Sequence, residues 1–380
     1  MIPILFVLPW AVTVVFLLIV VKRARLLPTG TVFDREGAPK VSVIIPARNE
    51  AENIEACLGS LTKSSYPNFE IIVVNDRSED RTAELARAVP RGNAKRLVVI
   101  DGVALPRGWF GKPWACQQGA RLSSAQLLLF VDADTTHGES LLSRSVTELQ
   151  NEGADLLNVI GYQVMGSFWE CLVQPQIFMS VVFRHPDLER SAGSTRWQDG
   201  IANGQFMLMK QESYRASGGH ESVRDRVLED LALAQLVKRH GQTLVIRLAM
   251  DDLATRMHRS LTDLIKGWSR LIQVGSIQGQ SLVPSFSLMV IGNLLLWVMP
   301  PVILMSTLLG MGGEAFLIWS SVVCGLSVLI HASFLKALKA PTYYALLYPL
   351  GSLIVVHIMV RSRMHAGDVE WKGRSYAVSK

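Results

Sequence analysis

Hydrophobic and polar positions alternate in blocks along residues 40–134. Four short apolar runs are typical of strands buried on both faces of a sheet, at residues 41–47, 69–76, 96–101 and 127–134. The segments between them have the spacing and capping residues of helices, at residues 51–61, 80–89 and 112–124. This order predicts an α/β domain with a Rossmann-like, mostly parallel sheet and a ligand site at the carboxyl ends of its strands.

Polar side chains gather directly after three of these predicted strands. They are Pro46, Ala47, Arg48 and Glu50 after the first, Asp76 after the second, and Asp132 and Asp134 after the fourth. Mg²⁺ and Mn²⁺ prefer oxygen ligands and commonly combine one or two carboxylates with substrate phosphates. An isolated Asp-x-Asp is more often a solvated loop, so the metal interpretation depends on its neighbours. No GxGxxG or GxxxxGK[ST] follows any strand, which disfavours dinucleotide-binding and P-loop sites.

Long apolar stretches flank this domain. Residues 2–21 carry no charge and precede Lys22, Arg23 and Arg25, which predicts an uncleaved N-terminal anchor over residues 1–25 with the following domain inside the cell. Three further apolar runs predict two to three crossings in a C-terminal membrane region, residues 282–360. We expect the basic tail, residues 361–380, to be cytoplasmic, so that residues 341–360 re-enter or lie along the interface.

The composition agrees with a soluble domain joined to membrane segments. The 380 residues are 49% hydrophobic with a mean hydropathy of +0.27, yet 18% are charged. A net charge of +6 suits an anionic membrane surface or a phosphorylated substrate, and the apolar segments favour these over nucleic acid. Four cysteines without paired spacing indicate neither a zinc site nor a disulfide framework.

Two later segments carry candidate chemistry. Glu229 and Asp230 open an amphipathic helix, a place where acidic residues are ordinarily partners of the helix dipole. Residues 259–281 have apolar side chains at helical spacing, which predicts an amphipathic helix in the headgroup plane. Trp268 in that helix fits an interfacial anchor as well as a substrate contact.

Taken in order, the motifs of the chain resemble those of family 2 glycosyltransferases of the GT-A fold. They are PARNEAENIEACLGSL, IIVVNDRSEDRT, GKPWACQQGA, FVDAD and VLEDLALA. Within this family, the chain resembles the membrane-bound lipid glycosyltransferases of the hopene-associated and carotenoid (diaponeurosporenoate) types, and more distantly ceramide glucosyltransferase. This closer resemblance rests on the GWSR stretch, the terminal WKGRSY and the membrane segments. The resemblance covers residues 40–280 well, and beyond them it rests on hydropathy and the tail.

The resemblance implies a role for each motif. A nucleotide-diphosphate sugar would bind at Pro46, Ala47, Arg48, Glu50, Asp76, Lys112 and Asp132, and Asp134 with Asp132 would hold Mg²⁺ or Mn²⁺. Asp230, beside Glu229, would be the general base of an inverting transfer. Candidate acceptor-site residues are Gly204, Gln205, His220, Trp268, Arg270, Trp371 and Arg374. Lys112 and His220 also fit an exposed lysine and a loop histidine.

The resemblance and the hydropathy together predict a metal-dependent hexosyltransferase. Residues 38–258 would form a catalytic domain at the cytoplasmic face of a bacterial-type inner membrane and move one sugar to a lipid acceptor, without a nucleic-acid partner. The chain lacks the QxxRW of processive polysaccharide synthases, which disfavours that alternative. A catalytically silent membrane scaffold or a transporter subunit is the alternative from another class. The predicted spans carry only His331 and His357 as ionisable residues, which disfavours a transporter.

Overall fold

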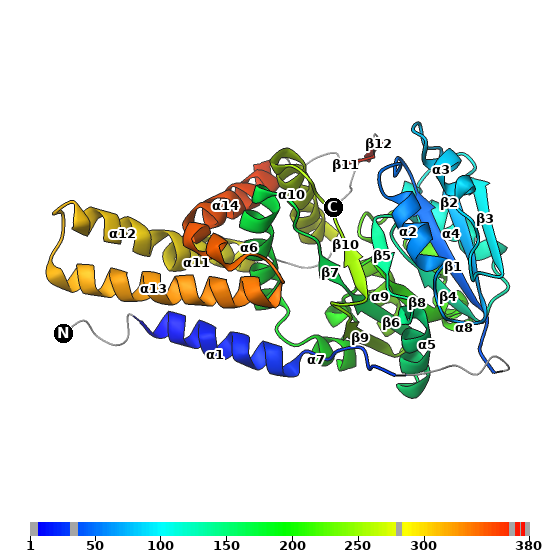
Figure 1. Cartoon of the computed structure of the whole chain (residues 1–380), viewed down its shortest axis with the longest axis horizontal. Helices are drawn as coiled ribbons and strands as arrows, with labels where there is room; N and C mark the ends of the chain where they lie inside the picture. The colour runs from blue at the N-terminus through cyan, green and yellow to red at the C-terminus, as the bar shows by residue number, and fades with distance from the viewer. Residues whose placement is uncertain (1–6, 31–36, 279–282, 365–368, 373, 377–380) are drawn as a thin grey trace.

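A seven-stranded mixed sheet forms the centre of the α/β domain (Figure 1). The computed structural model describes residues 7–30, 37–278, 283–364, 369–372 and 374–376. The sheet has the strand order β3-β2-β1-β4-β8-β6-β9. Its strands are β1 (Val41–Ala47), β2 (Phe69–Asn75), β3 (Arg96–Asp101), β4 (Leu127–Phe130), β6 (Leu156–Ile160), β8 (Met207–Lys210) and β9 (Leu244–Leu248).

The first four strands of the sheet are parallel, as their alternation with helices predicts. β1 pairs with β2 and β4, and β2 with β3, all in parallel, whereas β8 runs antiparallel to β4 and β6. The predicted fold class, an α/β domain with a mostly parallel sheet, is confirmed. β4 ends at Phe130, before the predicted end of the run at Asp134, because the chain turns at Asp132. The carbonyl of Asp132 accepts hydrogen bonds from the amide and hydroxyl of Thr135, at 3.3 and 2.6 Å.

Helices cover both faces of the sheet because alternate strand residues point to opposite sides. Val43 and Ile45 of β1 enter one core, and Ile44 enters the other. The first core contains residues of α2 (Ile54–Leu61), α3 (Thr82–Ala88) and α5 (Leu141–Asn151). The second contains residues of α4 (Gly111–Leu122), α8 (Gln211–Ala216) and α9 (Glu229–Arg239).

A small second sheet lies beyond the carboxyl end of β4. It has the order β5-β10-β7 and consists of β5 (Thr135–His137), β10 (Leu253–Thr255) and β7 (Tyr162–Gln163). β10 pairs antiparallel with β5, so the chain that leaves β10 at Arg256 passes close to the turn that holds Asp132 and Asp134. This chain then leads into α10 (Leu261–Gln278).

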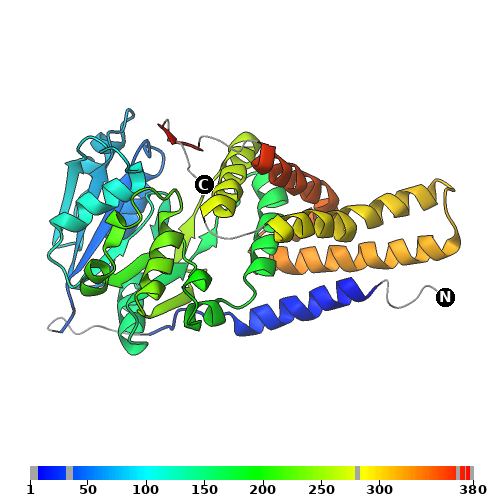
Figure 2. The same ribbon diagram turned by 180° about the vertical axis from the view of Figure 1, so that it is seen from behind.

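Apart from α7 (Leu188–Gly193), which packs against β9, the remaining α-helices extend away from the α/β domain (Figures 1 and 2). They are α1 (Leu8–Arg23), α6 (Phe168–Arg184), α10, α11 (Val283–Asn293), α12 (Met299–Leu308), α13 (Glu314–Ala337) and α14 (Tyr348–Met364). Among the described residues, three segments are long and apolar enough to cross a membrane: Ser287–Leu308, Glu314–Ala337 and Thr342–Met364. The three C-terminal apolar runs are therefore helical, as predicted. α1 has 16 described residues and is not among them, so the N-terminal anchor stays a prediction.

The last apolar segment begins and ends against the α/β domain. Before it, Lys339 pairs with Asp251 and donates to the carbonyl of Met250 at 3.2 Å. After it comes a hairpin of β11 (Val369–Trp371) and β12 (Arg374–Tyr376), from which Arg374 binds Asp76. In both ribbon views α13 ends beside the α/β domain, and α14 ends beside α10 (Figures 1 and 2).

Candidate active site

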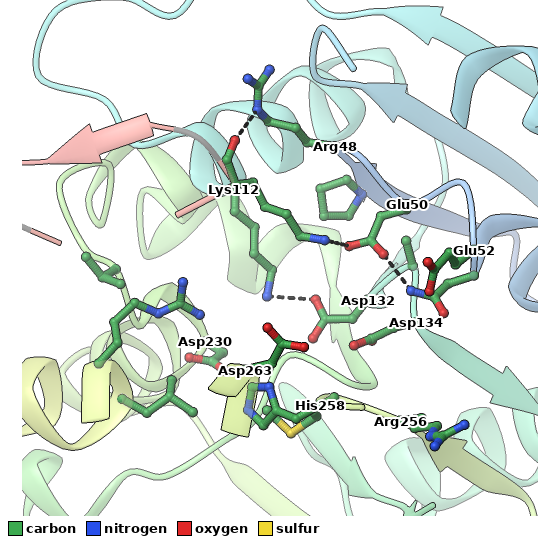
Figure 3. A pocket seen from close by; sticks show the side chains of 18 of the residues that line it. Arg48, Glu50, Glu52, Lys112, Asp132, Asp134, Asp230, Arg256, His258 and Asp263 are labelled. Carbon is green, nitrogen blue, oxygen red and sulfur yellow. Dashed lines mark hydrogen bonds and ion pairs between the residues drawn. The ribbon is translucent and has the colours of Figure 1, made fainter. Parts of the chain in front are cut away.

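A cavity of about 390 Å³ opens at the carboxyl ends of β1 and β4. Its walls come from the loop after β1, the first turn of α4, the turn after β4, the start of α9, the loop after β10, and α10 (Figure 3). The predicted site residues among its lining are Pro46, Arg48, Glu50, Lys112, Asp132, Asp134, Glu229, Asp230 and Arg270. Segments more than 200 residues apart in the sequence thus meet at the place where open α/β sheets bind ligands.

Lys112 lies at the centre of the charged groups of the cavity. Its Nζ is 2.7 Å from Oδ1 of Asp132 and 2.6 Å from Oε1 of Glu229. Burial opposes its charge, yet the carboxylates of Asp132, Glu229 and Asp230 together raise the pKa of Lys112 well above its usual value. The ammonium group therefore stays charged and links the turn after β4 to the first turn of α9.

The carboxylate of Asp134 lies at the turn after β4. Its Oδ1 is buried and has no hydrogen-bond partner within the described part of the chain. Burial, followed by the nearby carboxylates of Asp132 and Glu50, raises the pKa of Asp134 to about 7. Burying a hydrogen-bond acceptor without a donor costs free energy, and a bound divalent cation would offset this cost. Asp134 and Asp132 therefore fit a divalent cation.

The described residues contain no group of three or more histidine, cysteine, aspartate or glutamate side chains arranged to hold a metal ion. A cation at Asp132 and Asp134 would therefore take its other ligands from substrate and water. This is the usual arrangement for Mg²⁺, which retains several waters and binds one or two carboxylates together with substrate phosphates.

Glu229 and Asp230 begin α9 and differ in their surroundings. Glu229 is buried, with its charge offset by Lys112, and burial raises its pKa to about 7. Asp230 is half-buried at the cavity wall, where backbone N–H groups of Leu231 and Gly204 hydrogen-bond its carboxylate. Burial raises the pKa of Asp230 above the ordinary aspartate value. In the view of Figure 3, the end of the Lys112 side chain lies between Asp230 and Asp132.

Gly204 lies against the lysine and aspartate pair, where a side chain would not fit. A Cβ atom at this position would be 2.6 Å from Nζ of Lys112 and 2.9 Å from Oδ2 of Asp132. We expect Gly204→Ala to fold but to lose roughly tenfold or more in transfer rate, because Lys112 must leave at least one of its charge-assisted hydrogen bonds. Gly59→Ala is the matched control, since nothing lies within 4 Å of its added Cβ. Steady-state rates of both variants test the expectation, and an unchanged rate for Gly204→Ala would contradict it.

Among the predicted donor-binding residues, those in the loop after β1 reach the cavity, whereas Ala47 and Asp76 lie beneath it. Pro46, Arg48 and Glu50 line the cavity, and Ala47 is buried, with its carbonyl accepting the N–H of Asp76 at 2.8 Å. The side chain of Asp76 is only 2% exposed because Arg374 covers it. A direct contact between Asp76 and a nucleotide-sugar donor, which the family resemblance implies, would require Arg374 to move.

The candidate acceptor residues divide into two groups. Arg270 lines the cavity and Gly204 adjoins Lys112, but Gln205, His220 and Trp268 are buried outside the lining. Nδ1 of His220 lies 2.9 Å from the hydroxyl of Tyr214, its ring packs edge-on against Phe130, and burial lowers its pKa to about 3. These contacts fit a packing role for His220. The side chain of Trp371 lies outside the described residues.

Sequence reasoning missed the wall that follows β10. Arg256, Met257, His258, Arg259 and Asp263 all line the cavity. His258 packs against Gly267 and lies edge-on to Trp268, and Arg256 makes a bidentate pair with buried Glu170 of α6, at 3.0 and 2.9 Å. The only signal in the sequence was a run of cationic residues between a short strand and an amphipathic helix.

Comparisons with known proteins agree with this architecture. Residues 42–218 match the model of glycosyl transferase family 2. The chain is 27% identical over 350 residues to the 4,4'-diaponeurosporenoate glycosyltransferase of Staphylococcus aureus strain USA300, which covers 90% of this chain and 89% of the relative. A solved mannosyltransferase from Pyrobaculum calidifontis, in complex with GDP-Man and Mn²⁺, has the same fold, with a TM-score of 0.51 at 16% identity over 95% of this chain and 94% of that one. The family match over residues 42–218, the relative that is similar along most of the chain and the common fold together support a family 2 glycosyltransferase with a GT-A fold.

Proposed function

We propose that this enzyme transfers a single sugar from a nucleotide-diphosphate sugar to a membrane lipid, with inversion at the anomeric carbon. The observation that carries the proposal is the meeting of Lys112, Asp132, Asp134 and Asp230 in one cavity at the carboxyl end of the sheet. The relative from Staphylococcus aureus is named for a carotenoid acceptor, and the Pyrobaculum structure holds a nucleotide sugar. The first name supports a lipid-like acceptor for this chain, and the second supports a nucleotide-sugar donor.

Asp230 is the proposed general base. It lines the cavity, and its raised pKa brings it closer to the pH at which a base works well. As the acceptor hydroxyl attacks the anomeric carbon, the carboxylate of Asp230 takes its proton and the nucleotide diphosphate leaves from the opposite side. One base is sufficient for such a displacement. Glu229 keeps Lys112 in place beside Asp132 and so supports the donor side of the cavity.

Asp134 and Asp132 are the residues that would hold Mg²⁺ or Mn²⁺. When bound, the cation supplies positive charge to the diphosphate leaving group. The protein groups determine where such a cation can lie, because Lys112 orients Asp132 while Oδ1 of Asp134 has no other partner within the described residues.

The acceptor is proposed to approach from the membrane side of the cavity. Arg270 and Leu271 of α10 line the cavity, while Leu264 and Trp268 of the same helix pack with residues of α6 and α14. α10 therefore borders both the reaction site and the apolar helices. Its position in the headgroup plane and the cytoplasmic location of the α/β domain are parts of this proposal.

The proposed function can be tested with the purified enzyme in vesicles of host lipids. Radiolabelled UDP-, GDP- and dTDP-sugars are supplied one at a time, and the transfer of label to lipid is measured. We expect one donor to label a lipid that carries one sugar. Polymeric product would contradict single transfer. Failure of all three donors to label a lipid, in the presence of Mg²⁺ and Mn²⁺, would contradict the proposed reaction.

The tail is proposed to lie on the same side of the membrane as the α/β domain. Lys339 before the last apolar segment and Arg374 after it both bind that domain, and these contacts support an arrangement in which the two ends of the segment lie on one side of the membrane. A cysteine at Ser379, with the native cysteines replaced, should resist an impermeant thiol reagent in intact cells and react after permeabilisation. Met311→Cys, in the exposed loop between α12 and α13, should react in intact cells and is the matched control. Labelling of both in intact cells would contradict the arrangement.

A further inference from the structure

The C-terminal hairpin binds the α/β domain through charged groups that the proposed transfer chemistry does not use. Arg374 donates hydrogen bonds to both carboxylate oxygens of Asp76, at 2.6 and 3.0 Å. Nζ of Lys372 is 2.9 Å from Oε1 of Glu50 and donates to the carbonyl of Asn49 at 3.2 Å. The carbonyl of Lys372 accepts a hydrogen bond from Nε of Arg48 at 3.0 Å. The hairpin is therefore joined to the ends of both β1 and β2.

The backbone at this junction adopts a conformation that costs free energy. Asn49, Arg77 and Lys372 have φ angles of 53°, 55° and 46°, in the left-handed region that disfavours residues with a side chain. Only one other non-glycine residue in the described part of the chain, Lys339, has a positive φ. Such conformations persist where surrounding contacts determine them, and they cluster at ligand sites.

The cations already present at this end of the cavity are committed to protein groups. Arg48 donates to the carbonyls of Lys372, Asp76 and Arg77 and to the carboxylate of Glu79. Lys112 is held between Asp132 and Glu229. The hairpin brings two more cations to this end, Lys372, which lines the cavity, and Arg374. Both also bind protein carboxylates, but they add to the positive charge that a nucleotide diphosphate requires close to it.

We propose that the C-terminal hairpin forms a wall of the donor-nucleotide pocket, in which Asp76 holds the guanidinium of Arg374 so that it contacts the nucleotide. This inference rests on the proposed function and adds a binding residue to it. Asp76, covered by Arg374, is then a positioning residue and does not read the nucleobase directly. Arginine suits the role because its planar group can bind a carboxylate on one edge and present N–H donors on another.

Nucleotide binding can be measured without catalysis. UDP, GDP and dTDP, each with Mg²⁺, are titrated calorimetrically into the full-length enzyme in nanodiscs, and the tightest binder is kept as the probe. We expect Arg374→Ala to weaken its affinity roughly ten- to hundredfold, because charge-assisted hydrogen bonds are lost. Asp76→Asn should weaken it by a similar factor, and the double variant no more than the worse single one, since the two residues act as a unit.

Controls separate a binding role from a merely structural one. Arg363→Ala removes an exposed cation near the end of α14 and should leave the affinity within about twofold. In steady state, Arg374→Ala should raise KM for the donor while leaving KM for the lipid and the rate at saturating donor nearly unchanged. Arg374→Lys keeps the charge but loses the bidentate geometry, so an intermediate affinity is expected. It also serves as the test variant if the alanine variant does not fold.

The possible failures are distinguishable. No binding of any of the three nucleotides to the unaltered enzyme would overturn the proposed function, and this inference with it. Normal binding to the unaltered enzyme that is unchanged in Arg374→Ala would overturn only the role of the hairpin. Tighter binding to Arg374→Ala would also overturn it, because the hairpin would then compete with the nucleotide for Asp76.

Discussion

Replacing Asp134 with alanine is expected to abolish detectable transfer and to weaken donor binding. The substitution removes the buried oxygen that has no partner within the described residues, and with it one of the two carboxylates that would hold the cation. The loss should exceed the roughly 10- to 100-fold typical of residues that only support a metal ligand. Chelation of divalent cations should have the same effect on the unaltered enzyme, and added Mg²⁺ or Mn²⁺ should reverse it. Transfer rates and donor affinities with and without chelator provide the measurement.

Glu139→Ala is the matched control for the loss of a carboxylate from this segment. Glu139 is exposed, lies five residues after Asp134 and does not line the cavity, so its removal should change neither rate nor affinity. Full activity of the unaltered enzyme in excess chelator would remove the cation from the proposed mechanism.

Asp230→Asn is expected to bind the donor almost normally but to lose roughly two to four orders of magnitude in turnover. The amide keeps the shape of the side chain but cannot take a proton from the attacking hydroxyl. Glu229→Gln should differ from it by weakening donor binding as well, because Glu229 holds Lys112 beside Asp132. Single-turnover rates and nucleotide affinities of the two variants separate these roles. Wild-type turnover in Asp230→Asn would mean that another group is the base.

If Asp230 is the general base, the turnover rate should depend on its ionisation and therefore on pH. Burial raises the pKa of Asp230 in the folded enzyme, so the basic, ionised form is present only above that raised value. Turnover should therefore fall as the pH is lowered, at a pH above the ordinary aspartate range, and recover as it is raised. Asp134 and Glu229, whose pKa values burial raises to about 7, should contribute an acidic limb to both enzymes. The residual rate of Asp230→Asn should therefore depend on one ionising group fewer than the rate of the unaltered enzyme, and identical pH profiles of the two enzymes would contradict the assignment.

Local sequence determined the elements of the α/β domain. The predicted strands at residues 41–47 and 96–101 have the observed bounds, because apolar runs of this length are stable only when buried in a sheet. The turn that holds Asp132 and Asp134 could be placed at the end of β4, because charged side chains do not continue a strand that is buried on both faces. Parallel pairing followed from the alternation of strands with helices.

Tertiary structure alone decided which charged groups meet. Nothing in the spacing of Lys112 and Glu229 indicates that Nζ and Oε1 lie 2.6 Å apart, because α4 and α9 are brought together by packing against the same face of the sheet. The wall at His258 and the pairing of Arg374 with Asp76 depend in the same way on how α10 and the C-terminal hairpin return to the α/β domain.

The chain by itself therefore determined an α/β domain with a pair of carboxylates at the end of a buried strand and apolar helices after it, because burial and helical or strand periodicity are read locally. The fold decided that His220 is buried outside the cavity lining, that Arg270 lines the cavity and that Asp76 is covered by the tail. These outcomes depend on contacts between residues as many as 298 positions apart, and no local periodicity encodes such contacts.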